Sequence, residues 1–221
     1  KAVGVMMKAL DDAGIADNTI VVYSAEHGDQ LGEHNIIQKA VFYEQSIKVP
    51  MLIRAPWLGR GMRRIPGHFG HVDLVPTLLE LMGEEVPAYL EGRSQAAVLR
   101  GDATLEQNDV FVQWSERVRS EWPGVLERFL ATLEERYGRE VTPERVEELW
   151  SMPRRTIISG DNLKLNLATD DVPELYDLGA DPYETTNVFD RPENRGRVEE
   201  LAARLNAWQE RFSDTAPTMK V

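Results

Sequence analysis

The apolar positions in the first part of the chain change from helical to strand-like spacing. Hydrophobic side chains recur at helical intervals over residues 2–13, at Val3, Met6, Met7 and Leu10. Gly14 follows them and is typical of a helix end. Continuous apolar runs at 19–24 and 49–54 then predict two short strands. Pro50 suits the start or the edge of the second strand, because proline donates no ladder hydrogen bond.

A second helix is expected at 74–81. Asp73 stands where a side chain caps a helix, Pro76 falls in the tolerant first turn, and Gly83 marks the end. The order helix, strand, loop, strand, helix is that of half of a doubly wound α/β layer. Residues 1–100 are therefore predicted to form part of a larger α/β domain.

Residues 101–221 follow a different pattern. A strand is expected at 109–114, and a hairpin pairs 155–159 with 162–166 across Gly160-Asp161. A C-terminal helix is expected at 192–211, because one stripe carries Val198, Leu201, Leu205 and Trp208. This order predicts a small antiparallel-sheet α+β subdomain that follows the main α/β domain.

Residues 116–152 stand out as a helical insertion within this subdomain. Apolar side chains at helical spacing predict an amphipathic helix there, and Thr142-Pro143 begins another that ends near Trp150. Two roles are open for it: an insertion that packs on the body of the protein, or a lid or oligomer contact.

Composition restricts the partners of the chain. The 221 residues are 42% hydrophobic and 28% charged, which is ordinary for a globular protein of one large or two small domains. A net charge of −12 argues against a nucleic-acid partner, because neutralising phosphates needs clustered Lys and Arg. No apolar stretch approaches the ~20 residues of a membrane span. The absence of cysteine excludes disulfides and thiolate metal sites within this sequence.

Candidate chemistry follows the first predicted strand. Glu26 and His27 come directly after the apolar run that ends at Ser24, and ligands of open α/β sheets bind beyond the carboxyl ends of strands. A carboxylate oxygen and an imidazole nitrogen side by side can be two ligands of a divalent metal. Lys39 can return a positive charge to the same place and hold an anionic substrate.

Residues 24–34, Ser-Ala-Glu-His-Gly-Asp-Gln-Leu-Gly-Glu-His, resemble the second metal-binding motif of the sulfatase family, within the alkaline phosphatase superfamily. Lys39 stands in the family's Lys-x-x-x-(Tyr/Phe)-Glu context, which ends here at Glu44. Two departures are an Ala between the Ser and the acid, and Glu26 in place of Asp. Further segments at 71–79 and 175–187 also resemble recurrent sulfatase segments.

This resemblance implies an enzyme, a metal-dependent sulfuric ester hydrolase. Glu26 and His27 would be metal ligands, and Lys39 would be a catalytic residue that contacts the oxyanion of a sulfate ester or other anionic substrate. His34 would be either a structural residue of the loop or a substrate-binding residue. Ca²⁺ or Mg²⁺ suits an oxygen-rich site, and the imidazole also permits Mn²⁺.

The nucleophile of the family is absent. Most sulfatases use a cysteine that is oxidised to formylglycine, and this sequence contains no cysteine. The resemblance therefore implies that the chain is the C-terminal portion of a longer enzyme. The nucleophile and further metal carboxylates would lie in a missing N-terminal part, which would pack against this one. The 221 residues alone are expected to be inactive.

Two alternatives stay open. The parent protein can be a phosphonate monoester hydrolase or phosphodiester hydrolase of the same superfamily, since sulfuryl and phosphoryl transfer demand similar oxyanion stabilisation. It can also be a non-catalytic sulfatase-like protein that binds an anion, for which Ala25 and Glu26 are the best evidence.

Overall fold

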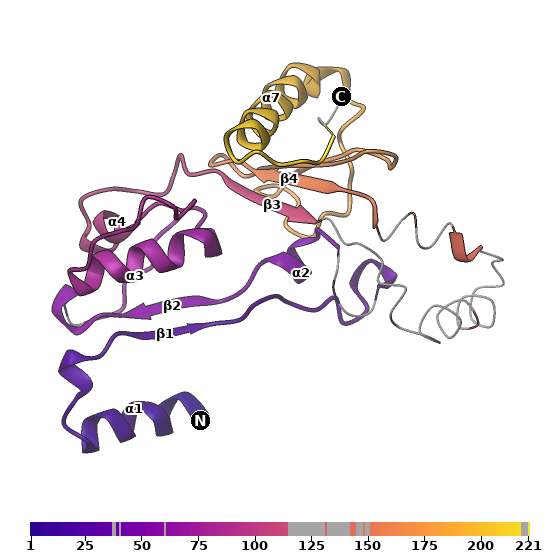
Figure 1. The fold of residues 1–221 in the computed structure, drawn as a ribbon. Helices are drawn as coiled ribbons and strands as arrows, with labels where there is room; N and C mark the ends of the chain where they lie inside the picture. Colours follow the sequence, from indigo (N-terminus) through magenta and orange to yellow (C-terminus); the bar gives the residue numbers. More distant parts are fainter. Residues whose placement is uncertain are drawn as a thin grey trace. The chain divides into compact units, whose positions relative to one another are not determined.

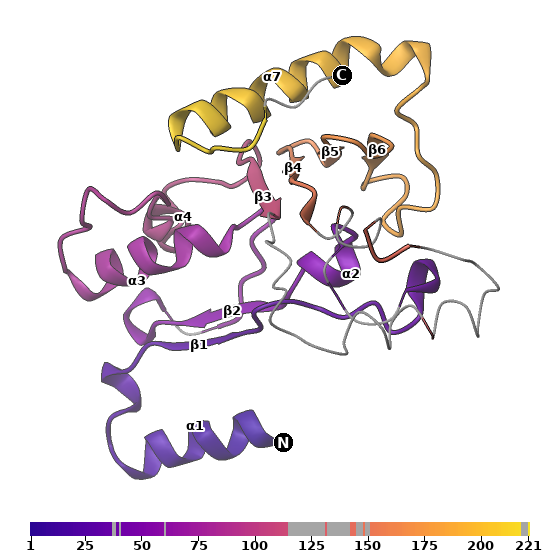
Figure 2. The same cartoon turned by 45° about the vertical axis from the view of Figure 1, so that its right-hand side comes forward.

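A computed structural model describes residues 1–36, 39, 41–59, 61–114, 131, 142–144, 148, 151–217 and 221 (Figures 1 and 2). The chain divides into two compact units. The first comprises Lys1–Val110 with Pro182–Glu184, and the second comprises Phe111–Asp181 with Thr185–Val221. The expected insertion at 116–152 lies almost entirely outside the described residues.

The first unit alternates short helices with two strands. Its elements are α1 (Ala2–Asp12), η1 (Ala16–Asn18), β1 (Val21–Ser24), η2 (Glu33–Asn35), α2 (Glu44–Ile47), β2 (Met51–Arg54), η3 (Pro56–Leu58), η4 (His71–Asp73), α3 (Leu74–Met82) and α4 (Ala96–Arg100). The predicted helices at 2–13 and 74–81 and both predicted strands are therefore present, within a few residues of their expected bounds.

The two strands of this unit run antiparallel and form a two-stranded sheet, seen in Figure 1 as the paired arrows β1 and β2. Tyr23 lies opposite Leu52 in the register, and their exposures are 49% and 56%. Helix α1 buries none of its residues, although most of them are apolar. Within the part of the chain that the structure describes, α1 and the strand pair therefore leave apolar side chains exposed to solvent.

Asp73 precedes α3 as predicted, but its carboxylate does not cap that helix. One carboxylate oxygen instead accepts the backbone N–H of Arg93 at 2.8 Å, and the other accepts the side-chain amide of Gln95 at 3.1 Å. The expectation of a side-chain cap was wrong, because a loop from later in the chain supplies better-placed donors. Gly83 ends the helix in the left-handed conformation, with φ of 80°.

The second unit contains a four-stranded sheet in the order β3-β4-β5-β6. Its elements are β3 (Val110–Trp114), β4 (Arg154–Ile158), β5 (Leu163–Ala168), β6 (Glu174–Asp177), η5 (Pro192–Asn194) and α7 (Arg195–Arg211). The pairs β4/β5 and β5/β6 are antiparallel. The predicted hairpin across Gly160-Asp161 is confirmed, and the predicted C-terminal helix corresponds to η5 and α7.

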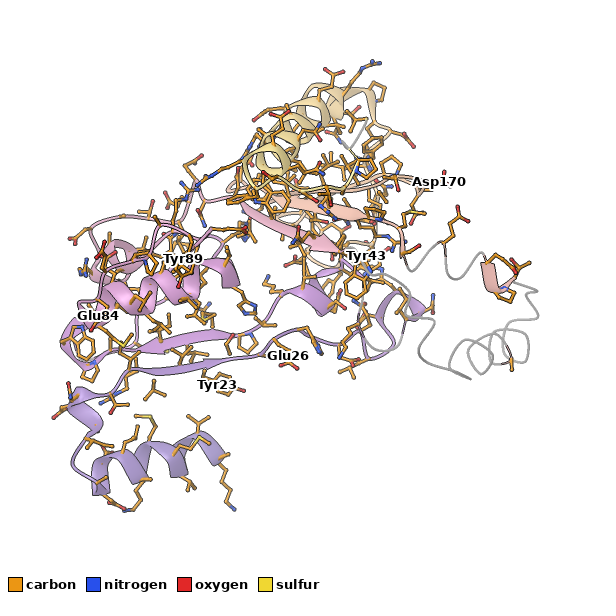
Figure 3. The ribbon with its side chains drawn as sticks, viewed as in Figure 1. Tyr23, Glu26, Tyr43, Glu84, Tyr89 and Asp170 are labelled. Atoms are coloured by element: carbon orange, nitrogen blue, oxygen red, sulfur yellow. The ribbon has the colours of Figure 1, made fainter. Side chains whose placement is uncertain are left out.

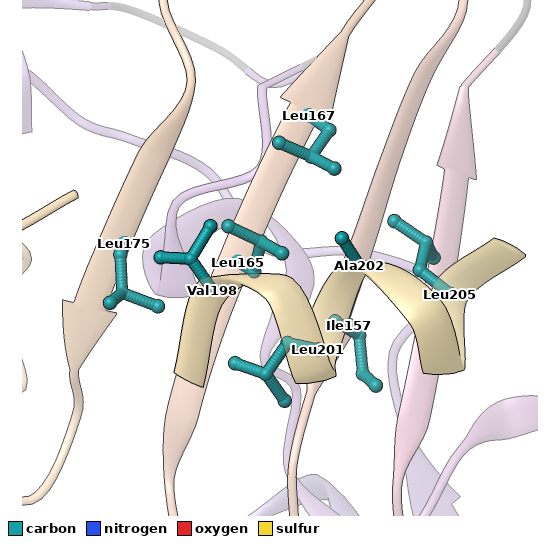
Figure 4. Close-up of a cluster of buried hydrophobic side chains, with 8 residues drawn as sticks. All are labelled: Ile157, Leu165, Leu167, Leu175, Val198, Leu201, Ala202 and Leu205. Atoms are coloured by element: carbon teal, nitrogen blue, oxygen red, sulfur yellow. The ribbon is translucent and has the colours of Figure 1, made fainter. Parts of the chain in front are cut away.

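Helix α7 covers one face of this sheet, and the two bury a continuous apolar cluster (Figure 4). The cluster consists of Ile157, Leu165, Leu167, Leu175, Val198, Leu201, Ala202 and Leu205. Val198, Leu201 and Leu205 come from the stripe that the sequence predicts, and Ala202 joins them. The strand members alternate with residues of the opposite face. Trp208 adds a parallel ring stack on Phe111, with centroids 5.2 Å apart.

No helix among the described residues combines the length and the apolar character that crossing a membrane requires.

Candidate metal and anion site

The candidate site begins where β1 ends. Ser24 is the last residue of the strand, and Glu26 and His27 occupy the turn that follows it, as Figure 3 shows for the labelled Glu26. Lys39 reaches the same place from the loop that leads to α2. Glu26, His27 and Lys39, three of the four predicted site residues, are therefore neighbours. Glu26 Oε1 and Lys39 Nζ lie 3.4 Å and 2.8 Å from the Nε2 atom of His27.

The imidazole of His27 has its tautomer fixed by the backbone. Its Nδ1 atom lies 2.7 Å from the carbonyl oxygen of Gly28, which only accepts hydrogen bonds, so Nδ1 carries the proton. The neutral ring then presents the lone pair of Nε2. A histidine whose Nδ1–H is held by a backbone carbonyl is the usual arrangement for a metal ligand. The donor set thus fits a divalent cation.

Lys39 donates to that same lone pair. Its ammonium has three donors and no acceptor, so at 2.8 Å it donates a hydrogen bond to Nε2 of His27. A fixed positive charge beside an imidazole is suited to hold an anion.

Glu26 is the exposed member of the group, with 83% of its side chain open to solvent. A hydrogen bond from its own backbone amide lowers its pKa, and the positive charge of the nearby Lys39 lowers it further. The carboxylate is therefore ionised at neutral pH and available as an oxygen ligand.

Gly28 allows the turn to pack closely on α2. Its N–H donates to the carbonyl oxygen of Ser46 at 2.7 Å. A Cβ atom at position 28 would overlap the carbonyl oxygen of Gln45. Only glycine fits here, so the turn that carries His27 packs directly against the backbone of α2.

The loop after Gly28 is shaped by local contacts. Oδ1 of Asp29 accepts the N–H of Leu31 at 2.9 Å, which forms a tight side-chain turn. His34 has a left-handed backbone, with φ of 52°, and its ring stacks on Tyr43 at 3.7 Å with an interplanar angle of 5°. This contact gives His34 a structural role in the loop, while its contact with substrate stays a prediction.

The part of the chain that the structure describes holds no cluster of three or more His, Cys, Asp or Glu residues arranged for a metal ion. Glu26 and His27 are thus two candidate ligands, and a complete site needs more. The sequence reasoning missed Gln30, three residues after His27, which is fully buried and whose amide atoms make no hydrogen bond to a described residue. It also missed Glu184, which approaches α2 from far along the chain.

Comparisons with known proteins support the resemblance to the sulfatase family. Residues 1–84 match the sulfatase family model. The chain is 28% identical over 220 residues to the N-acetylglucosamine-6-O-sulfatase of Bacteroides thetaiotaomicron, covering 99% of this chain and 35% of that protein.

Two solved structures have the same fold. BT4656, solved with its substrate D-glucosamine-2-N,6-O-disulfate, superposes with a TM-score of 0.74 at 26% identity, over 99% of this chain and 39% of that one. The phosphonate monoester hydrolase of Agrobacterium radiobacter superposes with a TM-score of 0.72 at 22% identity. The match covers 94% of this chain and 38% of that one. The chain thus spans between a third and two fifths of the length of these proteins, and it belongs to the sulfatase family of the alkaline phosphatase superfamily.

Proposed function

We propose that the chain supplies part of the active site of a metal-dependent sulfatase that hydrolyses sulfate esters. The observation that carries the proposal is the convergence of Glu26 and Lys39 on the Nε2 atom of His27, at 3.4 Å and 2.8 Å. An ionised carboxylate, a lone-pair nitrogen and a fixed cation in one place suit a metal and an anionic ester.

Glu26 and His27 would hold the divalent metal, which is Ca²⁺ in this proposal, with Mg²⁺ or Mn²⁺ as substitutes. A bound metal would supply Lewis-acid polarisation of the sulfuryl oxygens. The hydrogen bond from Nδ1 to the Gly28 carbonyl favours the tautomer that presents Nε2 as a ligand.

Lys39 would be the catalytic residue that stabilises negative charge on the sulfuryl group or on the leaving oxygen. The lone pair of Nε2 serves one partner at a time. The Lys39 ammonium is therefore available to an anion whenever Nε2 has another partner. The acidic net charge of the chain does not oppose this role, because binding an anion needs only a local positive focus.

The rest of the site would come from parts of the family's fold that these 221 residues do not include. These parts would provide a formylglycine nucleophile and the remaining metal ligands. They would also cover the open faces of α1, β1 and β2 and complete a doubly wound layer around residues 1–100, while 101–221 would form the smaller subdomain. We refer to the longer chain that contains both portions as the full-length protein.

A phosphonate monoester hydrolase or phosphodiester hydrolase is the second candidate, favoured by the shared fold with the Agrobacterium enzyme. Both chemistries place charge on oxygens around a tetrahedral centre, so the described residues suit either.

Parallel assays of the full-length protein on an aryl sulfate and a phosphodiester, with and without a chelator, test the proposal. Chelator-sensitive sulfate release that exceeds phosphodiester cleavage is expected. A preference for the phosphodiester would select the second candidate. If both esters stay intact and Glu26→Asp creates no turnover, the protein is a non-catalytic anion binder and the proposal fails.

A further inference from the structure

Glu184 is a buried carboxylate that lies far along the chain from Glu26, His27 and Lys39. It follows the Asp181-Pro182 turn, its backbone is left-handed with φ of 54°, and it is only 2% exposed. An acidic side chain is almost never this buried unless it has a specific partner. Residues 182–184 also group with the first unit, although the chain on both sides of them belongs to the second.

Glu184 contacts the first residue of α2. Its Oε2 atom accepts the backbone N–H of Glu44 at 2.6 Å, across 140 residues of sequence. The N–H groups of a first helical turn have no acceptor within the helix. A charged acceptor makes a stronger hydrogen bond than a neutral one, so Glu184 fixes the start of α2.

Helix α2 in turn holds the turn that carries His27. The carbonyl oxygen of Ser46 accepts the N–H of Gly28 at 2.7 Å, and the carbonyl of Gln45 fills the space where a side chain at position 28 would lie. The carbonyl of Gly28 accepts the Nδ1 proton of His27. A continuous set of contacts therefore leads from Glu184 through α2 to the lone pair of Nε2.

We propose that Glu184 is a positioning residue for the candidate metal and anion site. Its carboxylate holds α2 where the carbonyl of Ser46 can accept the N–H of Gly28. The turn fixed in this way orients the imidazole of His27. The significance for catalysis rests on the proposed function, whereas the positioning itself is a property of the fold and is measured without turnover.

Amide hydrogen exchange of Gly28 tests the proposal directly. In Glu184→Ala, exchange at Gly28 should accelerate about tenfold or more, the factor expected for losing one hydrogen bond to a charged group. Glu184→Gln keeps an oxygen acceptor and should accelerate it less. The matched control is Asp181→Asn, which alters the same turn, where Asp181 binds Thr185 and Thr186 rather than α2.

The amide of Glu84 reports on general destabilisation, because it is bonded to Leu79 at the end of α3 in the same unit. Its exchange should stay unchanged in all three variants. Unchanged exchange at Gly28 in Glu184→Ala, or equal acceleration at Gly28 and Glu84, would overturn the proposal. Should Glu184→Ala not fold, the same comparison in Glu184→Gln decides, because its side chain has nearly the same shape.

A kinetic comparison separates this inference from the proposed function. In the full-length protein Glu184→Ala should lower kcat for the sulfate ester, and Glu184→Gln should restore part of it. A full-length protein with no turnover would contradict the proposed function, while accelerated exchange at Gly28 would still support the positioning role.

Discussion

The Nζ atom of Lys39 lies 2.8 Å from the Nε2 atom of His27, although the two residues are separated by a loop. This contact joins a permanent cation to the lone pair of a histidine whose other nitrogen is held by the Gly28 carbonyl. The pair places a candidate metal ligand, His27, beside a candidate anion-binding group, the ammonium of Lys39.

Replacing Lys39 by alanine should lower kcat of the full-length protein by ~10²-fold or more, the usual effect of losing one oxyanion donor. The matched control is Lys48→Ala, because Lys48 is exposed and its ammonium pairs with Glu44 on α2. Steady-state kinetics on an aryl sulfate measure both variants. Equal activity in Lys39→Ala and Lys48→Ala would show that Lys39 is an ordinary surface lysine.

Gly28→Ala should destabilise the first unit by roughly 1–3 kcal/mol, because the new methyl group overlaps the backbone of α2. Gly4→Ala is the control, since position 4 lies in α1 with no atom near the new methyl. That substitution should be neutral or stabilise the helix by up to about 1 kcal/mol. Urea unfolding measures the difference. Equal midpoints for Gly28→Ala and Gly4→Ala would show that Gly28 does not pack closely against α2.

Asp214 predicts an acid-sensitive contribution to stability. Its carboxylate makes a two-point contact with the buried Arg155, at 2.5 Å and 2.7 Å, and this hydrogen-bonded pairing lowers its pKa to about 2. The pKa in the unfolded chain is higher, so the folded state is favoured while the group is ionised in both states. The contribution, about 2 kcal/mol, is present above pH ~4 and is lost as pH falls toward 2.

Urea midpoints at several pH values measure this contribution. Asp214→Asn should cost about 3–5 kcal/mol at pH 7, because Arg155 then keeps its buried charge without an anionic partner. The same variant should lose less stability than the parent chain between pH 4 and pH 2. Parallel pH profiles for the two proteins would mean that the Arg155–Asp214 pair does not titrate as described.

Leu201→Ala tests the core of the second unit. Leu201 is fully buried between α7 and the sheet, so the substitution should cost about 2–5 kcal/mol through lost burial and a residual cavity. Val172→Ala removes an exposed side chain and should change the free energy of unfolding by less than about 0.5 kcal/mol. A comparable loss in both variants would contradict the assigned core.

The sequence predicted those elements whose signal is local. The stripe of Val198, Leu201 and Leu205 repeats with the period of a helix, and α7 buries that stripe. Gly83 ends α3 because glycine adopts the left-handed backbone conformation easily, and this preference does not depend on distant residues. Glu26, His27 and Lys39 also lie together as expected, because the motif sets both the strand end and the loop length.

Features that depend on distant partners could not be predicted. A continuous apolar run does not specify pairing direction, so the antiparallel register of Tyr23 and Leu52 came only from the structure. Asp73 has the residue type and position of a cap, yet its acceptors are used by a later loop. Glu184 contacts Glu44 across 140 residues, a separation that no local pattern encodes.

Metal titration of the full-length protein most directly tests the central claim that Glu26 and His27 are metal ligands in a sulfatase site. After removal of bound metal, calorimetry with Ca²⁺ should show one site, and His27→Gln and Glu26→Gln should each weaken it at least about tenfold. The control variant Glu33→Gln, which alters an exposed acid of the same loop, should bind as the parent does. Equal affinity in all four proteins would contradict the assignment of the site.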